Sequence, residues 1–224
     1  MDDRLEFAQE IIRYLSKDEK VCEVCLKGSL AGGAFDEYSD IDISVDVSGH
    51  DNGVYAINLP DYLSEKYNIC FYDWSPSLLP DKYVLTFAFN KLPVFWLVDI
   101  ECTAMPHVPS VPWVSVETAP HLLKLWIANA KYYLRGVDGI ELEIYKLAKK
   151  VMHEEDIVIN NTGRLMLQVL EGIKDIASPE CYRYIDECSK IVWPRTLPVT
   201  TTPAKAIPVA LQLRKTFDEI HCAS

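Results

Sequence analysis

One stretch near the N-terminus combines a glycine turn with closely spaced acidic residues, and it constrains this chain more than any other feature. Residues 27–47 read KGSLAGGAFDEYSDIDISVDV. An apolar run ends at Gly28 and Ser29, and a second apolar run begins with Asp40 and Asp42, two residues apart. This pattern predicts two strands that are joined by a glycine-bearing loop.

The two acids of the second run are predicted to share one face of a strand. Alternate side chains of an extended segment point the same way, so Asp40 and Asp42 would project side by side, about 7 Å apart. Two carboxylates at that distance repel each other by roughly 2 kcal/mol at an effective dielectric constant of about 20. A divalent cation would reverse the sign of this interaction. Oxygen ligands suit Mg²⁺, which completes its coordination shell with water and substrate phosphates.

The glycine turn supplies the other half of such a site. Gly28 lacks a Cβ atom, so backbone N–H groups at the turn can approach a phosphate closely, and Ser29 adds a hydroxyl group. The stretch therefore predicts that a metal ion and a phosphate bind at the same loop.

The Gly-Ser pair followed, after ten residues, by Asp40 and Asp42 resembles the signature of the DNA polymerase β-like nucleotidyltransferase superfamily. Within it, the stretch is most similar to the branch that adenylylates aminoglycosides and related antibiotics. The resemblance implies that Gly28, Ser29 and Ser39 contact a nucleotide, with ATP as co-substrate. It also implies that Asp40 and Asp42 hold Mg²⁺ against the phosphates.

One departure from that signature follows the Gly-Ser pair. Relatives commonly have a basic residue there, whereas this chain has Leu30, Ala31 and Gly32. If the basic side chain normally contacts the triphosphate, another Lys or Arg must replace it. A catalytically inactive, nucleotide-binding relative is therefore kept as an alternative.

The resemblance further implies a third carboxylate on a later strand. In the apolar stretch 94–102, alternation places Asp99 and Glu101 on one face and Val98 and Ile100 on the other. Asp99 is the preferred third carboxylate, acting as a metal ligand or as the base that accepts a hydroxyl proton, and Glu101 is its substitute.

Periodicity along the chain predicts an α+β fold with two domains. Residues 1–110 are expected to form a nucleotidyltransferase domain with a mixed five-stranded sheet and flanking helices. Residues 115–224 are expected to form an antiparallel helical bundle that binds the acceptor. Expected strands are 21–26, 41–47, 68–74, 82–89 and 94–102, and expected helices include 3–16, 118–136, 162–176, 179–192 and 204–221, with a further one from Gly139. Pro60 predicts a broken helix at 54–66, or one that starts near Leu59.

Charge and composition narrow the expected partners. The net charge is −11, and residues 1–114 contain 19 acidic against 8 basic residues. Such a field favours a cationic small molecule near the metal site and disfavours nucleic acid, so no nucleic acid is expected among the partners. No apolar run reaches the about 18 residues that cross a membrane, so no membrane partner is expected. Seven scattered cysteines suit a reducing compartment, and a cytoplasmic location is expected.

A basic ridge on the helix predicted from Gly139 is a second place where phosphate could bind. It consists of Lys146, Lys149 and Lys150. Lys149 is the candidate contact to a nucleotide phosphate across an interdomain cleft, and a solvated helix face is the alternative interpretation.

These features predict a metal-dependent enzyme that transfers a nucleoside monophosphate, AMP from ATP in the first instance, to a hydroxyl of a small molecule and releases pyrophosphate. The resemblance points to an aminoglycoside-type or lincosamide-type acceptor. The alternative is a protein-modifying nucleotidyltransferase of the toxin–antitoxin type. The oligomeric state stays open.

Overall fold

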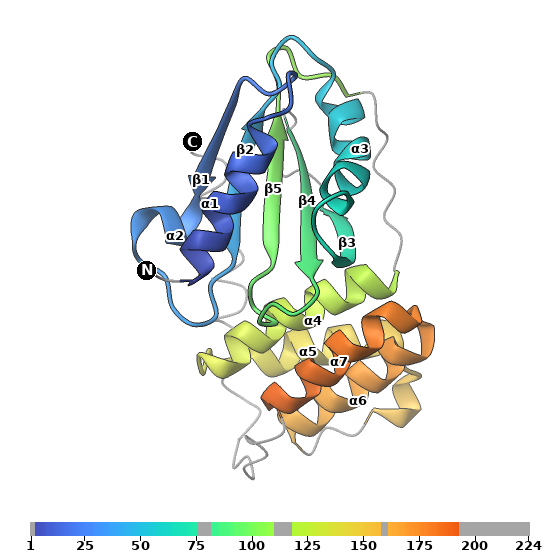
Figure 1. Ribbon diagram of the computed structural model, residues 1–224. Helices are drawn as coiled ribbons and strands as arrows, with labels where there is room; N and C mark the ends of the chain where they lie inside the picture. The colour runs from blue at the N-terminus through green and yellow to red at the C-terminus, as the bar shows by residue number, and fades with distance from the viewer. Residues whose placement is uncertain (1–2, 76–81, 110–117, 158–160, 193–224) are drawn as a thin grey trace. The chain divides into compact units, whose positions relative to one another are not determined.

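The computed structural model describes residues 3–75, 82–109, 118–157 and 161–192 (Figure 1). The chain divides into two compact units, Met1–Val116 and Glu117–Ser224. The helix predicted at 204–221 lies outside the described residues.

The first unit is built on a mixed five-stranded sheet with the strand order β1-β2-β5-β4-β3. Strands β2 and β5 are parallel, and the other neighbouring pairs are antiparallel. The α+β fold and the five-stranded mixed sheet that the sequence predicts are confirmed. The strands are β1 (Glu23–Lys27), β2 (Ile41–Asp46), β3 (Ile69–Ser75), β4 (Lys82–Phe89) and β5 (Val98–Thr103).

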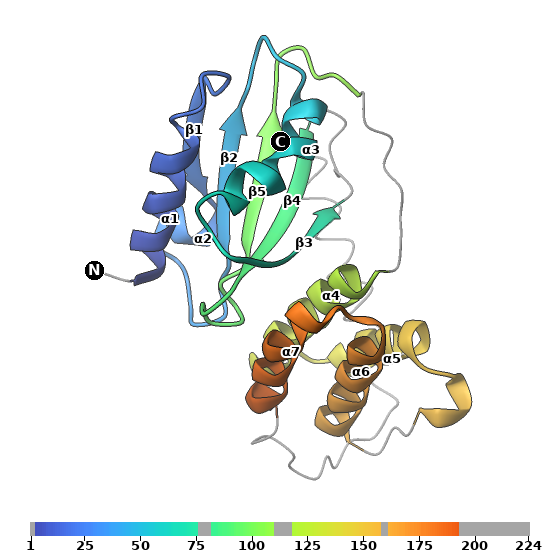
Figure 2. The same cartoon turned by 45° about the vertical axis from the view of Figure 1, so that its right-hand side comes forward.

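The two central parallel strands alternate between buried apolar and half-buried polar residues. This alternation gives the sheet one apolar and one polar face. Helices α1 (Asp3–Leu15) and α3 (Asn52–Ser64) lie on the apolar face (Figures 1 and 2). The strand residues of that face are at most 1% exposed: Ile41, Ile43, Val45, Val98, Ile100 and Cys102.

Helix α3 corrects the prediction of a broken helix at 54–66. It runs without interruption from Asn52 to Ser64, with Pro60 inside it. Asp51 caps its N-terminus by accepting a hydrogen bond from the N–H of Val54. Pro60 and its neighbour Leu59 are buried, so tertiary packing of this face outweighs the helix-breaking tendency of proline.

The loop predicted after β1 also differs, because it contains the short helix α2 (Gly28–Gly32). Leu30 is 4% exposed and packs in the core of the first unit. Gly33 ends the helix in the left-handed conformation, with φ 70°. The segment thus forms a short helix that buries Leu30 in the core, although its glycines predict irregular structure.

The second unit is helical. It contains α4 (Ala119–Leu134), α5 (Ile140–Val151), α6 (Thr162–Ile176) and α7 (Pro179–Val192), with the 3₁₀ turn η1 (Glu154–Asp156) after α5. Trp126 of α4 is 1% exposed, and its Nε1 donates a hydrogen bond to the carbonyl of Met166 at 2.9 Å. Among the described residues, no helix has the length and apolar character that crossing a membrane requires.

A buried amide connects the start of α3 to the segment that follows β5. Asn52 is 0% exposed, and its Nδ2 donates to the carbonyl of Cys102 at 3.2 Å. The same nitrogen lies 2.9 Å from Nδ1 of His107, and Oδ1 accepts from the N–H of Val108 at 3.2 Å. The amide therefore satisfies several polar groups inside the fold.

Replacing Asn52 by alanine is expected to lower the free energy of unfolding by about 2 to 3 kcal/mol, because its buried partners lose their hydrogen bonds. Asn58→Ala is the matched control, since Asn58 is an exposed amide of the same helix whose Nδ2 donates to the carbonyl of Val54 within that helix. The control is expected to change stability by less than about 0.5 kcal/mol. Urea unfolding followed by circular dichroism measures both variants, and equal losses would contradict the role of Asn52.

Candidate active site

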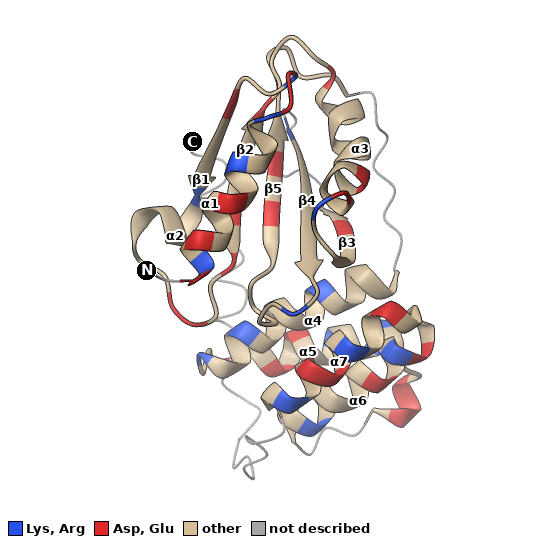
Figure 3. Cartoon of the chain, in the orientation of Figure 1, with Lys and Arg blue, Asp and Glu red and all other residues tan. Residues whose placement is uncertain are grey.

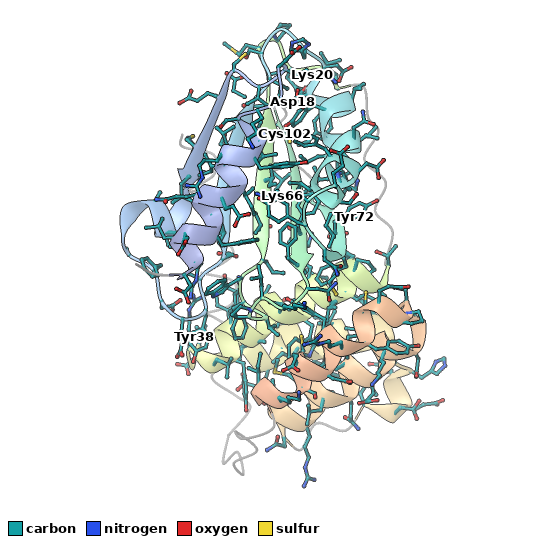
Figure 4. The ribbon with its side chains drawn as sticks, in the orientation of Figure 1. Asp18, Lys20, Tyr38, Lys66, Tyr72 and Cys102 are labelled. Carbon is teal, nitrogen blue, oxygen red and sulfur yellow. The ribbon has the colours of Figure 1, made fainter. Side chains whose placement is uncertain are left out.

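Two acidic residues meet on the polar face of the sheet because their strands are neighbours in register. Asp42 of β2 pairs with Asp99 of β5 in the parallel ladder. Neighbouring strands lie about 4.8 Å apart, and residues in register share a face. Figure 3 shows acidic residues along β5. On the opposite face of β5, burial raises the pKa of the Cys102 thiol (labelled in Figure 4), so this thiol stays protonated and adds no charge.

The glycine turn touches the first of these carboxylates. A Cβ atom placed on Gly28 would lie 1.9 Å from Oδ2 of Asp42, and Gly28 has φ +63°. Both the contact and the left-handed backbone exclude a larger residue at this position. The glycine turn and the acidic strand, which the sequence predicts to form one site, are therefore in direct contact.

Lysine 27 flanks the same acid from the other side. Lys27 of β1 is the register partner of Asp42 in the antiparallel ladder, and its side chain is exposed. Cross-strand partners share a face, so Lys27 brings a positive charge to this part of the sheet. The sequence did not single out Lys27, because relatives commonly have their basic residue after the Gly-Ser pair and not before it. Its position directly before Gly28 is the sequence feature that could have identified it.

The two candidates for the third carboxylate have different surroundings. Asp99 Oδ1 accepts a hydrogen bond from Oγ1 of Thr86 at 2.5 Å, and Thr86 is 2% exposed. Glu101 instead forms an ion pair with Lys82, with Oε2 2.5 Å from Nζ. Asp99 is thus the acid beside Asp42, whereas Glu101 pairs with a lysine of β4.

Asp40 lies directly before β2 and is half-buried. Within the described part of the chain, no group of three or more His, Cys, Asp or Glu side chains is close enough to hold a metal ion, so Asp40, Asp42 and Asp99 do not form a complete metal cage. The neighbouring carboxylates of Asp42 and Asp99 nevertheless fit Mg²⁺. Proteins often hold this ion by one or two carboxylates, and water and substrate phosphates supply its other ligands.

The two serines predicted to contact a nucleotide lie on either side of the connecting segment. Ser29 is half-buried in α2, and its carbonyl accepts from the N–H of Ala34 at 3.0 Å. Ser39 is 7% exposed, and its Oγ donates to Oδ1 of Asp36 and accepts from the N–H of the same residue. The hydroxyl of Ser39 therefore orders the turn that leads into β2. Contact of either serine with a nucleotide stays a prediction.

Lys149 belongs to the second unit and has partners there. Its Nζ lies 3.1 Å from Oε1 of Glu154 and 5.6 Å from the ring centroid of Tyr145. The hydrogen bond with Glu154 raises the pKa of Lys149, so this amine is charged near neutral pH. Its predicted contact with a nucleotide stays a prediction.

Comparison with known proteins gives one family and several distant structures. Residues 8–93 match the family model of the nucleotidyltransferase domain. The matched region includes Gly28, Asp42 and Thr86 and ends before Asp99. No curated protein matches the sequence.

Three solved structures illustrate the distant similarities. The Cid1 poly(U) polymerase with MgGTP is 15% identical, with a TM-score of 0.37, over 80% of this chain and 52% of that one. The GLD-2/RNP-8 complex is 14% identical, with a TM-score of 0.36, over 94% and 64%. The polymerase core of TRAMP, an RNA surveillance complex, is 12% identical, with a TM-score of 0.32, over 85% and 55%. This chain therefore spans about half the length of the poly(U) polymerase chain.

The prediction that nucleic acid is absent from the partners is corrected. The matched structures include a poly(U) polymerase and the polymerase core of an RNA surveillance complex, which contradicts that exclusion. The exclusion depended on the acidic charge of residues 1–114. Net charge describes a long-range field, whereas an acceptor can be bound through a few local contacts, so the charge does not decide between acceptor classes.

The family match and the contact at Gly28 involve the same part of the first unit. The match covers the glycine turn and the acidic strand, and Gly28 contacts the carboxylate of Asp42. Residues 8–93 of the first unit are therefore similar to a nucleotidyltransferase domain.

Proposed function

We propose that this protein is an enzyme that transfers a nucleoside monophosphate to a hydroxyl group of an acceptor. The donor is a nucleoside triphosphate, ATP in the first instance. The observation that carries the proposal is the contact between the backbone of Gly28 and the carboxylate of Asp42, which is in register with Asp99. A triphosphate held against this turn would lie beside two acids that can share a cation.

The carboxylates of Asp42 and Asp99 would hold Mg²⁺, with Asp40 as a further ligand. When bound, the ion would supply charge neutralisation at the phosphates and at the leaving oxygen. Gly28 and Ser29 would contact the phosphates through backbone N–H groups and a hydroxyl. Lys27, exposed and paired with Asp42, would provide the positive charge that relatives carry after the Gly-Ser pair.

Asp99 is the residue proposed to accept the proton of the acceptor hydroxyl. Thr86 donates to its Oδ1 and so fixes the orientation of the carboxylate. The acceptor oxygen would form a bond to the α-phosphorus while the bond from that phosphorus to the oxygen bridging the β-phosphate breaks. Pyrophosphate leaves with the electron pair of that bond, and the hydroxyl proton goes to Asp99.

The proposed acceptor is a small hydroxylated molecule that carries positive charge, such as an aminoglycoside. The resemblance of residues 27–47 to the branch that adenylylates antibiotics supports this choice. The acidic charge of residues 1–114 is compatible with a cationic acceptor but does not exclude other acceptor classes. Pyrophosphate release with ATP and Mg²⁺ is the assay, with separate arms for aminoglycosides, lincosamides and an oligonucleotide that ends in a free 3′-hydroxyl. Release in the oligonucleotide arm alone would contradict a small-molecule acceptor.

Asp42→Asn is expected to reduce Mg²⁺-dependent pyrophosphate release at least about a hundredfold, because a metal ligand and its charge are lost. Asp61→Asn, an exposed acid of α3, is the control that removes a charge elsewhere in the same unit. Circular dichroism checks that both variants fold. Normal turnover of the folded Asp42 variant would refute the metal assignment.

Asp99→Asn and Glu101→Gln separate the two candidates for the third carboxylate. Turnover is expected to fall about a hundredfold or more in the first variant, since general-base catalysis typically contributes that much. The second variant breaks an ion pair with Lys82 and is expected to keep turnover within about threefold of the wild type. A larger effect at Glu101 than at Asp99 would reverse the assignment.

Gly28→Ala is expected to displace the carboxylate of Asp42 and to reduce turnover about tenfold or more, because the new Cβ would overlap Oδ2. Gly32→Ala is the matched control in the same helix, where a Cβ would meet nothing within 4 Å. The control is expected to change turnover by less than about twofold. Equal activity of the two variants would contradict the close contact at Gly28.

A further inference from the structure

Arg4 of α1 is a charged residue that lies inside the first unit. It is 6% exposed, which is unusual for arginine, since burial of a charge costs free energy unless hydrogen bonds compensate. Its guanidinium lies next to the segment that leads into β2. This burial calls for a specific role of the side chain.

The guanidinium holds the backbone of that segment through several hydrogen bonds. Nη1 donates to the carbonyl of Asp36 at 2.7 Å and to the carbonyl of Ser39 at 3.0 Å. Nη2 lies 3.4 Å from the carbonyl of Glu37 and donates to it. One planar group thus fixes three carbonyls within four residues, and the last of them belongs to the residue before Asp40.

The same guanidinium contacts the segment that leads into β5. Its Cζ lies 5.4 Å from the ring centroid of Trp96, which belongs to that segment. It also lies 5.6 Å from the ring centroid of Phe35, in the segment that leads into β2. The carbonyl of Leu97, which follows Trp96, accepts the N–H of Ile41 at 2.9 Å. Arg4 therefore contacts both segments just before they pair with each other as β2 and β5.

Other contacts link the same two segments. Tyr38, labelled in Figure 4, packs edge-to-face against Phe95 with ring centroids 5.3 Å apart. Asp36 Oδ1 accepts hydrogen bonds from the N–H of Tyr38 and from Oγ of Ser39. Hydrogen bonds within residues 36–39 therefore order this turn. Arg4 connects the turn to α1 and to Trp96.

Asp40 lies between two fixed points of the backbone as a result. The carbonyl of Ser39 is held by Arg4, and the N–H of Ile41 is held by Leu97. We propose that Arg4 is a positioning residue for nucleotidyl transfer, which sets the approach of Asp40 and Asp42 toward Asp99. This inference rests on the proposed function of those acids. A lysine could not replace the arginine fully, because a single ammonium group lacks the planar fork that reaches several carbonyls.

The test compares Arg4→Lys with Arg13→Lys, which makes the same change at an exposed position of the same helix. Three quantities are measured: kcat and KM for ATP in pyrophosphate release, half-saturating Mg²⁺, and hydrogen exchange of the Ile41 amide. Arg4→Lys is expected to lower kcat about tenfold to a hundredfold, as small misplacements of reacting groups do, with KM for ATP within about twofold. It is expected to raise half-saturating Mg²⁺ and to accelerate exchange at Ile41, while Arg13→Lys changes none of these.

A folded Arg4→Lys variant that keeps wild-type kcat and Mg²⁺ dependence would overturn the positioning role, even if its melting temperature falls. Unchanged exchange at Ile41 would overturn it as well. If Arg4→Lys does not fold, Arg4→Gln replaces it under the same criteria, and failure of both to fold marks a purely structural role and rejects the inference. A wild-type protein that neither releases pyrophosphate nor binds ATP with Mn²⁺ contradicts the proposed function itself, which distinguishes that failure from one confined to Arg4.

Discussion

The in-register pairing of β2 with β5 is the constraint on which the site depends. It sets the carboxylates of Asp42 and Asp99 side by side, an arrangement that like charges oppose. The opposite face of the same strands fixes the register, because Ile43 and Ile100 are buried there, and a slip by one residue would turn them outward. Burial of apolar side chains thus keeps two carboxylates close together although they repel each other, and the proposed Mg²⁺ would reduce this repulsion.

Local pattern was sufficient for much of the fold. The bounds of β4, α6 and α7 agree with the prediction residue for residue, because their apolar periodicity and turn residues are contained within each segment. The candidate site was predictable only in part. Gly28 and Asp42 share a short motif, but the hydrogen bond from Thr86 to Asp99 and the place of Lys27 depend on which strands are neighbours. A single sequence does not encode that order in any local pattern.

The failures of prediction have a common physical cause, which is that tertiary contacts outweighed local preference. Pro60 stays inside α3 because its face of the helix is buried, and α2 forms because Leu30 reaches the core. The role of Arg4 was not predicted, because a single arginine in an amphipathic helix is normally expected to face solvent. Only the folded chain brings it to the carbonyls of 36–39.

The place of β1 at one edge of the sheet has a consequence for the behaviour of the protein in concentrated solution. Among the described strands β1 is an edge strand, and the N–H and C=O groups of such an edge can recruit a strand from another molecule. Strand β1 has only five residues, and its two ends are the exposed, charged Glu23 and Lys27. Short length and terminal charges oppose the stacking of copies edge to edge, so the lysine beside the carboxylate of Asp42 also protects the molecule from aggregation.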